Sequence, residues 1–362
     1  MSVFSDIRAF VMKYERYVSP VTLVMGFTFD SLMLRRIDVF FSNALLISYL
    51  LIAALSILIL NISVSRREEQ DNKETTFHLI LVFMMQFCFG GLFSASFLFY
   101  SRSGSVIASW PFLVLILAYM MGNEFFRKNY TRLGFQVATL FSAIFSFLIF
   151  FFPVILSRMD DAIFLLSGIA SLIITGFFVY VLSWFTPQRV KKGTLMLVGS
   201  VLGIFALINM LYFTNLIPPI PLALKELGVY QSLSKFPDGS YLLTGDRRSL
   251  LDSLLGRATV HVVAGEPLYA FNAIFAPASL STDIVHDWQY YDKTNGWVTS
   301  SRIGLSIVGG RESGFRTYSI KENLFPGKWR VNVETVRGQL IGRLTFDLVL
   351  SDATEQLITD VR

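Results

Sequence analysis

Aromatic side chains that could bind a ring-shaped ligand gather around one turn in the C-terminal third of the chain. Trp288 and Tyr291 precede this turn, Trp297 follows it, and Arg316 lies further along. Aromatic faces near an arginine can stack on sugar rings or grip a peptide. We therefore predict a ligand-binding surface that includes Trp288, Tyr291, Trp297 and Arg316. Tyr291 and Trp297 are nearest the turn and are the best candidates for exposure.

The alternative is that some of these rings belong to a core. Successive side chains of a strand point to opposite faces, so Trp288, Tyr290 and Trp329 could all alternate into the interior. For any one aromatic residue, burial in a core is the more common outcome. Both interpretations stay open at the level of the sequence.

Catalytic and metal-binding constellations are not visible in the sequence. His286 and Asp287 are neighbours on a predicted strand and point to opposite faces, which is poor geometry for a His–Asp dyad. His261 is the other histidine of this region, and two histidines without cysteines do not make a zinc site. Cys88, the one cysteine, lies in an apolar run and is expected to be a small buried hydrophobic residue. We predict no enzymatic activity, no metal and no cofactor.

Asp30 is the one acidic residue that could lie at membrane depth. It belongs to the apolar segment 17–34, which also contains Pro20 and Gly26 and forms either a span or a re-entrant hairpin. A carboxylate inside a membrane is tolerated mainly for function, as in a transporter or an intramembrane enzyme. The other interpretation, which we favour, places Asp30 at a hairpin turn, paired with Arg35 or Arg36.

The elements that carry these residues are of two kinds, and the first is a membrane domain. The chain of 362 residues is 53% hydrophobic and 16% charged, whereas soluble domains contain about 25% charged residues. A run of about 18 or more apolar residues can cross the bilayer as a helix. Together with the weaker segment 17–34, six such runs predict an all-α membrane bundle of about seven transmembrane helices within residues 1–217: Phe40–Ile62, Leu79–Tyr100, Val106–Met121, Leu133–Leu156, Ala162–Phe185 and Thr194–Phe213.

The distribution of charge orients this bundle. Residues 1–215 hold 16 basic and 11 acidic residues, whereas residues 216–362 hold 15 of each, so no basic surface for nucleic acid is expected. With seven spans and a cytoplasmic N-terminus, 12 basic loop residues lie inside and 4 outside, as the positive-inside rule requires. The C-terminal domain is then extracytoplasmic, which means periplasmic in a Gram-negative bacterium.

The second kind of element is the strand. Three prolines in residues 218–221 predict a stiff, extended linker over 218–223. Residues 224–362 then show short alternating runs broken by turns such as Asn295-Gly296, a pattern typical of an all-β sandwich. The predicted strands are Ala258–Val263, Leu268–Phe275, Ile284–Tyr291, Val298–Val308, Phe315–Ile320, Trp329–Val333 and Gln339–Leu350.

Four motifs in this region carry a resemblance to a known family. They are His286–Trp288, Gly314–Ser319, Pro326–Val331 and Gly338–Arg343, and segments 14–20, 34–38 and 217–222 match as well. Through them the chain resembles bacterial membrane proteins that carry the C-terminal domain of unknown function 2914. The resemblance implies a bacterial envelope protein with several spans and a small β-rich module. It implies no activity and no catalytic residues.

Three functions are compatible with these observations. The first is a binding or accessory module, in which the bundle anchors a sandwich that contacts a periplasmic protein or an envelope glycan. The second is a structural subunit of a larger inner-membrane complex, with a small-residue face such as Gly90–Ser96 buried against a partner. The third is a transporter or an intramembrane enzyme that uses Asp30. We expect the lipid bilayer as a partner in every case.

Overall fold

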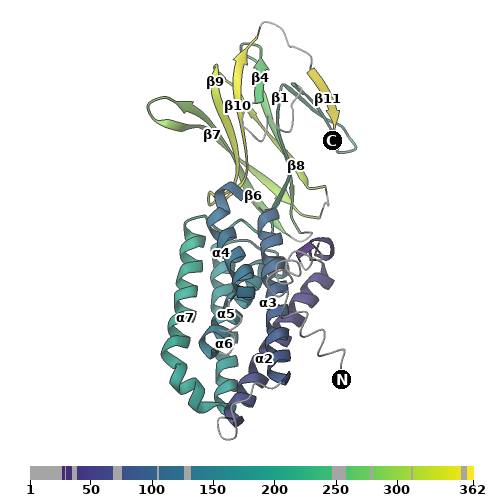
Figure 1. Cartoon of the computed structure of the whole chain (residues 1–362). Coiled ribbons are helices and arrows are strands. Elements are labelled where there is room, and N and C mark those ends of the chain that lie inside the picture. The colour runs from purple at the N-terminus through teal and green to yellow at the C-terminus, as the bar shows by residue number, and fades with distance from the viewer. Residues whose placement is uncertain are drawn as a thin grey trace, which may run out of the picture. The chain divides into compact units, whose positions relative to one another are not determined.

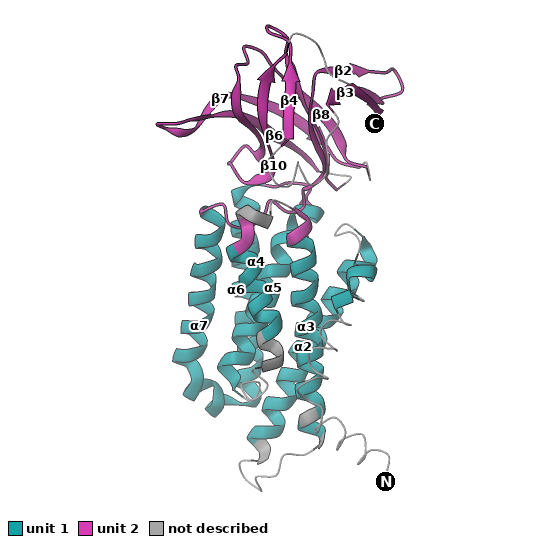
Figure 2. Cartoon of the chain, turned by 45° about the horizontal axis from the view of Figure 1, so that its top comes forward, with its two compact units in different colours: residues 1–100, 111–155, 160–213 teal, residues 101–110, 156–159, 214–362 magenta. Residues whose placement is uncertain are grey.

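A computed structural model describes residues 27–28, 30–34, 39–67, 76–103, 106–125, 132–246, 258–277, 280–310, 313–351 and 357–362. The chain divides into two compact units, coloured teal and magenta in Figure 2. Unit 1 comprises residues 1–100, 111–155 and 160–213, and unit 2 comprises residues 101–110, 156–159 and 214–362. The sequence-based boundary at residue 217 differs by assigning segments 101–110 and 156–159 to the helical domain.

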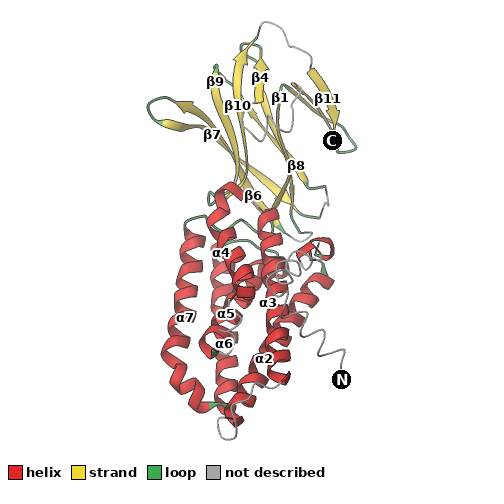
Figure 3. Cartoon of the chain, viewed as in Figure 1, coloured by secondary structure: helices red, strands yellow, loops and turns green. Residues whose placement is uncertain are grey.

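Unit 1 is helical, as the apolar runs predict (Figures 1 and 3). A helix satisfies its own backbone hydrogen bonds, which is what a segment in lipid requires. Among the described residues, five helices are long and apolar enough to cross a membrane, and the apolar part of α4, Ser109–Met121, is shorter. The helices are α2 (Phe40–Arg67), α3 (Thr76–Ser103), α4 (Val106–Phe125), α5 (Leu133–Leu156), α6 (Asp161–Phe185) and α7 (Pro187–Phe213).

Small residues allow these helices to approach each other closely. A Cβ atom at Gly91 of α3 would lie 2.6 Å from the ring of Tyr49 on α2. A Cβ atom at Gly168 of α6 would lie 2.9 Å from the ring of Phe205 on α7. Glycine at helix contacts is typical of membrane bundles, where packing replaces the hydrophobic effect as the driving force.

Unit 2 contains the strands, and all seven strands predicted from the sequence are present. Four more were missed, at the two ends of the unit. The strands are β1 (Ala223–Tyr230), β2 (Ser232–Lys235), β3 (Tyr241–Asp246), β4 (Ala258–Val262), β5 (Leu268–Phe275), β6 (Ser281–Asp292), β7 (Gly296–Val308), β8 (Phe315–Lys321), β9 (Gly327–Thr335), β10 (Leu340–Leu350) and β11 (Leu357–Val361).

The predicted sandwich is confirmed. One sheet has the order β1-β5-β8, the second has the order β4-β10-β9-β6-β7, and a third, small sheet has the order β11-β3-β2. Ala270 and Leu268 of the first sheet share one buried cluster with Trp288, Trp329 and Phe346 of the second. The core therefore lies between the first two sheets.

The turn between β6 and β7 has the chemistry that its sequence predicts. The Asp292 carboxylate accepts hydrogen bonds from the backbone N–H groups of Thr294 (2.9 Å) and Asn295 (2.7 Å). Gly296 follows with φ of 73°, a conformation that glycine adopts without strain. This turn sets the register in which Tyr291 lies opposite Trp297.

The proline-rich segment is not the extended spacer that the sequence predicts. The N–H of Ile220 donates to the carbonyl of Pro218, and the N–H of Leu222 donates to that of Pro219, so the chain makes two consecutive turns. Leu222 is packed in a core cluster of the sandwich, and the carbonyl of Ile217 accepts a bond from the Gln339 side chain. Apolar contacts within unit 2 therefore override the extended preference of the prolines.

Candidate functional site

Strand β6 separates its side chains between two environments. His286 and Trp288 lie opposite Val333 and Val331 of β9 and face the core. The residues between and after them, Asp287, Gln289 and Tyr291, face the other way, because side chains alternate along a strand. We call the first set the inner face and the second set, with its neighbours on β7, β9 and β10, the outer face.

The inner face carries a polar network that joins the two main sheets. His286 Nε2 lies 2.8 Å from Asn272 Oδ1, and His286 Nδ1 lies 2.8 Å from Ser319 Oγ. The Trp288 Nε1–H donates to the same Ser319 hydroxyl at 3.0 Å, and the Thr317 hydroxyl donates to Asn272 Oδ1 at 2.7 Å. A neutral imidazole donates through one ring nitrogen and accepts through the other, so His286 joins Asn272 and Ser319 across the two sheets.

This network is made of contacts within the sandwich. His286 is fully buried, and burial lowers its pKa to about 4, so the ring is neutral at physiological pH. Both ring nitrogens are occupied by neighbouring side chains of the sandwich. His286 therefore has no free nitrogen with which to take a proton from a substrate.

Trp288 requires a correction. The aromatic cluster in the sequence predicts Trp288 on the ligand-binding surface, but its side chain is 0% exposed and lies in the core cluster with Trp329. Its indole N–H is directed inward to Ser319. The core interpretation is the one that holds for Trp288, because it lies two positions from His286 along the strand and therefore shares its face.

Tyr291 and Trp297 do form an aromatic pair on the outer face. They lie directly opposite each other across β6 and β7, with ring centroids 5.4 Å apart in a T-shaped arrangement. Tyr291 is 50% exposed, and Trp297 is partly exposed. The guanidinium carbon of Arg330, on β9, lies 4.2 Å from the centroid of the Trp297 ring. Such a contact is a cation–π interaction.

Charged and amide side chains extend the outer face beyond the aromatic pair. Arg330 Nε donates to Gln289 Oε1 at 2.6 Å, and Arg343 Nε donates to Asn332 Oδ1 at 2.7 Å. Arg302 Nη2 lies 3.9 Å from Glu334 Oε2. The groups lie on neighbouring strands because β10, β9, β6 and β7 are adjacent in the sheet.

Two carboxyl groups lie among these arginines. Asp287 is 4% exposed, accepts a bond from Gln289 through Oδ2, and has no hydrogen-bond partner in the described structure at Oδ1. Burial, followed by the charge of Asp287, raises the pKa of Glu334. Burial, followed by the charge of Arg343, lowers the pKa of Arg330 to about 10, so Arg330 remains charged at neutral pH.

Arg316 does not join this group. It lies on β8 of the other main sheet, opposite Ala273 of β5. Strands β7 and β8 meet where Lys321 Nζ donates to Ser301 Oγ at 2.9 Å. Arg316 and Trp297 lie on opposite sides of that contact, which separates them by roughly 30 Å at the rise of a strand. The predicted partnership of Arg316 with the aromatic residues is therefore wrong, and Arg330 takes its place.

Sequence reasoning missed Arg330 and Arg343, although a signal for Arg330 was present. Trp329, Val331 and Val333 alternate with Arg330, Asn332 and Glu334, so an inner apolar row implies an outer polar one. The pairing of β9 with β6 and β10 was needed to bring Arg330 to Trp297 and Arg343 to Asn332, and pairing cannot be read from one strand.

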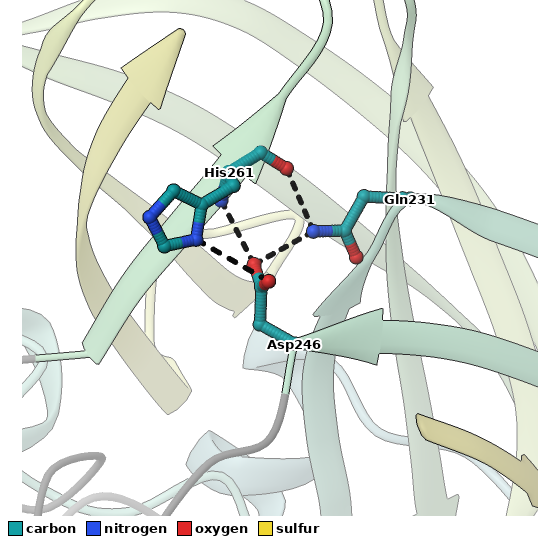
Figure 4. Close-up of polar contacts among 3 residues, drawn as sticks. All are labelled: Gln231, Asp246 and His261. Atoms are coloured by element: carbon teal, nitrogen blue, oxygen red, sulfur yellow. Dashed lines mark hydrogen bonds and ion pairs between the residues drawn. The ribbon is translucent and has the colours of Figure 1, made fainter. Parts of the chain in front are cut away.

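A second polar cluster, shown in Figure 4, joins β4 to the small sheet. Asp246 Oδ2 accepts from the backbone N–H of His261 (2.8 Å) and from Gln231 Nε2 (2.7 Å), and Asp246 Oδ1 lies 3.3 Å from His261 Nδ1. Gln231 Nε2 also donates to the carbonyl of His261. The carboxylate is thus occupied by backbone and amide donors, which is how a strand junction is held together.

Asp30 lies in unit 1, in a short helical stretch that covers residues 30–33 of the described chain. Its side chain is 7% exposed and lies near Ser94 of α3. Arg35 and Arg36, its predicted partners, lie outside the described residues, as does most of segment 17–34.

The small-residue patch around Gly91 packs against Tyr49 within the same unit. Another buried contact of this unit is an amide pair, in which Asn61 Nδ2 donates to Gln136 Oε1 at 2.7 Å.

No set of three or more histidine, cysteine, aspartate or glutamate side chains among the described residues could hold a metal ion. The arrangement that offers chemistry to a ligand is the outer face, with an aromatic pair, arginine donors and carboxylate acceptors.

Comparison with known proteins points to one family. A family model described as "Protein of unknown function (DUF2914)" matches residues 281–348. The sandwich contains a DUF2914 region. The match spans Trp288, Tyr291, Trp297, Arg330 and Arg343, so both faces of β6 belong to the DUF2914 region. No curated protein matches the sequence.

The solved structures that match this chain are only weakly similar to it. A β-glucosidase from Listeria innocua in complex with gluconolactone has a TM-score of 0.18 at 11% identity, over 34% of this chain and 16% of that chain. The alkylpurine DNA glycosylase AlkC of Pseudomonas fluorescens has a TM-score of 0.22 at 12% identity, over 83% of this chain and 97% of that chain. Scores this low carry no argument about fold or function.

Proposed function

We propose that this chain is a multi-pass protein of the bacterial inner membrane that presents its DUF2914 sandwich to a protein or glycan partner outside the cytoplasm. The observation that carries the proposal is the contact of Tyr291, Trp297 and Arg330 on the outer face. Its rings lie 5.4 Å apart, the guanidinium carbon lies 4.2 Å from the indole centroid, and Tyr291 is half exposed. Aromatic residues and arginine are the residue types enriched in the binding hot spots of proteins.

The outer face is suited to binding because its polar groups are only partly occupied. The inner network pairs both nitrogens of His286, whereas Asp287 Oδ1 has no partner in the described structure. A buried acceptor without a partner is unfavourable, and a ligand or an ordered water that supplies a donor removes that cost. The proposal assigns the protein no enzymatic activity.

Two experiments test the proposal. Full-length protein in nanodiscs is applied to a glycan array, and full-length protein in cells is crosslinked to its protein partners. Trp297→Ala removes the central ring, and Phe236→Ala serves as the matched control because Phe236 is an aromatic residue of the same unit, 41% exposed, at the β2–β3 turn. We expect Trp297→Ala to abolish binding and Phe236→Ala to retain it. A partner that binds equally well to both variants contradicts the proposal. If that partner is a stoichiometric membrane protein, the structural-subunit hypothesis takes its place.

The proposed orientation rests on the basic loop residues. Residues such as Arg189, Lys191 and Lys192, at the start of α7, lie on the cytoplasmic side when the N-terminus is cytoplasmic. Single cysteines at Thr294 and Lys191, in a Cys88→Ser background, can be labelled with a membrane-impermeant maleimide. We expect Thr294→Cys to react in spheroplasts and Lys191→Cys to react only after lysis, and the reverse pattern would invert the proposed topology.

A further inference from the structure

We propose that the outer face of the DUF2914 sandwich binds an acidic glycan, with Arg330 and Arg343 holding the carboxylate or phosphate of a sugar that contacts Trp297 and Tyr291. This inference rests on the proposed function and names the chemical class of its ligand. Each of the two arginines bonds to the protein through one nitrogen, and the remaining donors are available to a ligand.

The sheet register places the two arginines beside each other. Arg343 of β10 lies opposite Asn332, and Thr345 lies opposite Arg330 of β9, so Arg330 and Arg343 are diagonal neighbours on one face. Diagonal neighbours in an antiparallel pair are about 7–8 Å apart, within reach of long side chains. The two guanidinium groups are close enough for the charge of Arg343 to disfavour the charge of Arg330. One anionic group can therefore contact both.

The protein fixes each guanidinium through Nε. Arg330 uses Nε to bond Gln289, and Arg343 uses Nε to bond Asn332. Within the described part of the chain, the terminal nitrogens of these two arginines donate no hydrogen bond to another side chain or to the backbone. A guanidinium held in this way presents a planar pair of donors, the geometry that binds carboxylate or phosphate oxygens in a bidentate manner.

The local charges favour an incoming anion. Arg302, Arg330 and Arg343 surround the carboxyl groups of Asp287 and Glu334, and burial raises the pKa of Glu334. Burial makes each guanidinium cation costly, and the charges of Asp287 and Glu334 offset only part of that cost, because the pKa of both arginines stays lowered. An anion on the surface relieves that cost, whereas a cationic partner increases it.

The aromatic pair selects a sugar among anionic ligands. Trp297 supports the Arg330 guanidinium at 4.2 Å, and Tyr291 offers a half-exposed ring beside it on the same face. A stacking surface next to an anion-binding fork matches a pyranose ring with a charged substituent. A phospholipid headgroup satisfies the arginines alone and leaves the two rings without a counterpart.

The experiment measures binding of full-length protein, in nanodiscs of zwitterionic lipid, to two acidic glycans and their neutral counterparts. The probes are polygalacturonate with its methyl ester and phosphomannan with its dephosphorylated form. We expect at least one acidic glycan to bind more tightly than its neutral counterpart. Arg330→Gln and Arg343→Gln should each weaken that binding about tenfold to a hundredfold, the effect of losing a charge-assisted hydrogen-bond pair.

Arg316→Gln is the matched control, because it removes the same charge from the same domain on the other main sheet. It should leave glycan binding unchanged. Arg343 is more exposed than Arg330, so Arg343→Gln serves as the second variant if Arg330→Gln disturbs the fold. Equal losses in Arg316→Gln and Arg343→Gln would indicate a general charge effect and overturn the proposal.

Other outcomes also decide the question. Lack of binding to both acidic glycans, or equal affinity for the neutral forms, overturns the inference. Arginine-dependent binding to phosphatidylglycerol vesicles, without binding to either glycan, assigns the face to lipid instead. If Trp297→Ala abolishes binding of a neutral glycan or of a protein, the proposed function stands while the acidic-glycan inference fails. If Trp297→Ala has no effect on any ligand, both fail.

Discussion

The inner and outer faces of strand β6 carry similar polar side chains, but those of the inner face bond to one another and those of the outer face keep donors and acceptors for a ligand. On the inner face, His286 bonds Asn272 and Ser319, and the indole N–H of Trp288 bonds the same serine, so the ring nitrogens of both residues are used within the chain, while Asn272 Nδ2 has no partner in the described structure. On the outer face, Arg330 and Arg343 use only Nε, and Asp287 Oδ1 has no partner in the described structure. A polar group whose bonds are filled internally stabilises the fold, and one with bonds left over is available to a ligand.

Removing one large side chain from each face tests the difference between the faces most directly. Trp288→Ala should lower the free energy of unfolding of the sandwich by about 3–5 kcal/mol, because it leaves a cavity in the core. Tyr291→Ala, three residues along the same strand and half exposed, should change it by about 1 kcal/mol or less.

Urea titration of the full-length protein in detergent, followed by pulsed hydrogen exchange of β6 and β9 peptides, measures both variants. Exchange reports on the sandwich by itself, so changes in the helical unit do not obscure the result. Equal losses at the two positions would show that Tyr291 is a core residue and would remove the distinction between the faces.

Acid should destabilise the inner face specifically. Burial lowers the pKa of His286 from an ordinary 6.5 to about 4, so the unfolded chain takes up a proton before the folded one does. Stability is therefore complete above pH 6.5 and is lost as the pH falls toward 4, by about 3 kcal/mol in total for this group. Chemical unfolding at pH 7, 6, 5 and 4, with the same exchange readout, measures the slope.

The control for this prediction is His286→Asn, which cannot titrate. It should lower stability at pH 7 and flatten the dependence between pH 6.5 and 4. A slope that persists unchanged in His286→Asn would show that other groups cause the acid sensitivity.

The sequence was sufficient for one face of the DUF2914 region and not for the other. Alternation along single strands predicted all seven central strands and placed Trp329, Val331 and Val333 on one face, because periodicity is local information. It could not place Arg316 or Arg330 relative to Trp297, since that depends on which strands pair. The order β10-β9-β6-β7 brings Arg330 to Trp297 and leaves Arg316 on the other sheet. Strands β1, β2, β3 and β11 were missed because their runs are short or interrupted, and their pairing partners stabilise them.

In the proline-rich segment, too, tertiary contacts override the local preference of the sequence. Pro218 and Pro219 favour an extended chain locally, but the carbonyls of both accept turn hydrogen bonds, and Leu222 packs into the sandwich core. Burial of one leucine side chain is worth about 1.5–3 kcal/mol, which exceeds the local preference.

Loss of a single hydroxyl sharpens the contrast between the faces. Ser319→Ala removes the partner of both His286 Nδ1 and Trp288 Nε1, and should lower stability by about 1–3 kcal/mol because two buried groups lose their bond. Ser306→Ala on the outer side of β7 removes an exposed bond to Asp283 and should cost about 0.5 kcal/mol or less. The same exchange measurement compares them. A loss in Ser306→Ala as large as that in Ser319→Ala would contradict the prediction.

The smallest expected effect is the coupling between Tyr291 and Trp297. Edge-to-face aromatic pairs contribute about 0.5–1.5 kcal/mol beyond their buried area, and this pair lies directly across β6 and β7 with centroids 5.4 Å apart. A double-mutant cycle with Tyr291→Ala and Trp297→Ala should therefore give a coupling energy in that range for stability. The same cycle measured on ligand binding decides what the pair is for. Coupling in stability alone means that the rings only hold the hairpin together, whereas a larger coupling in binding means that a ligand contacts both rings at once.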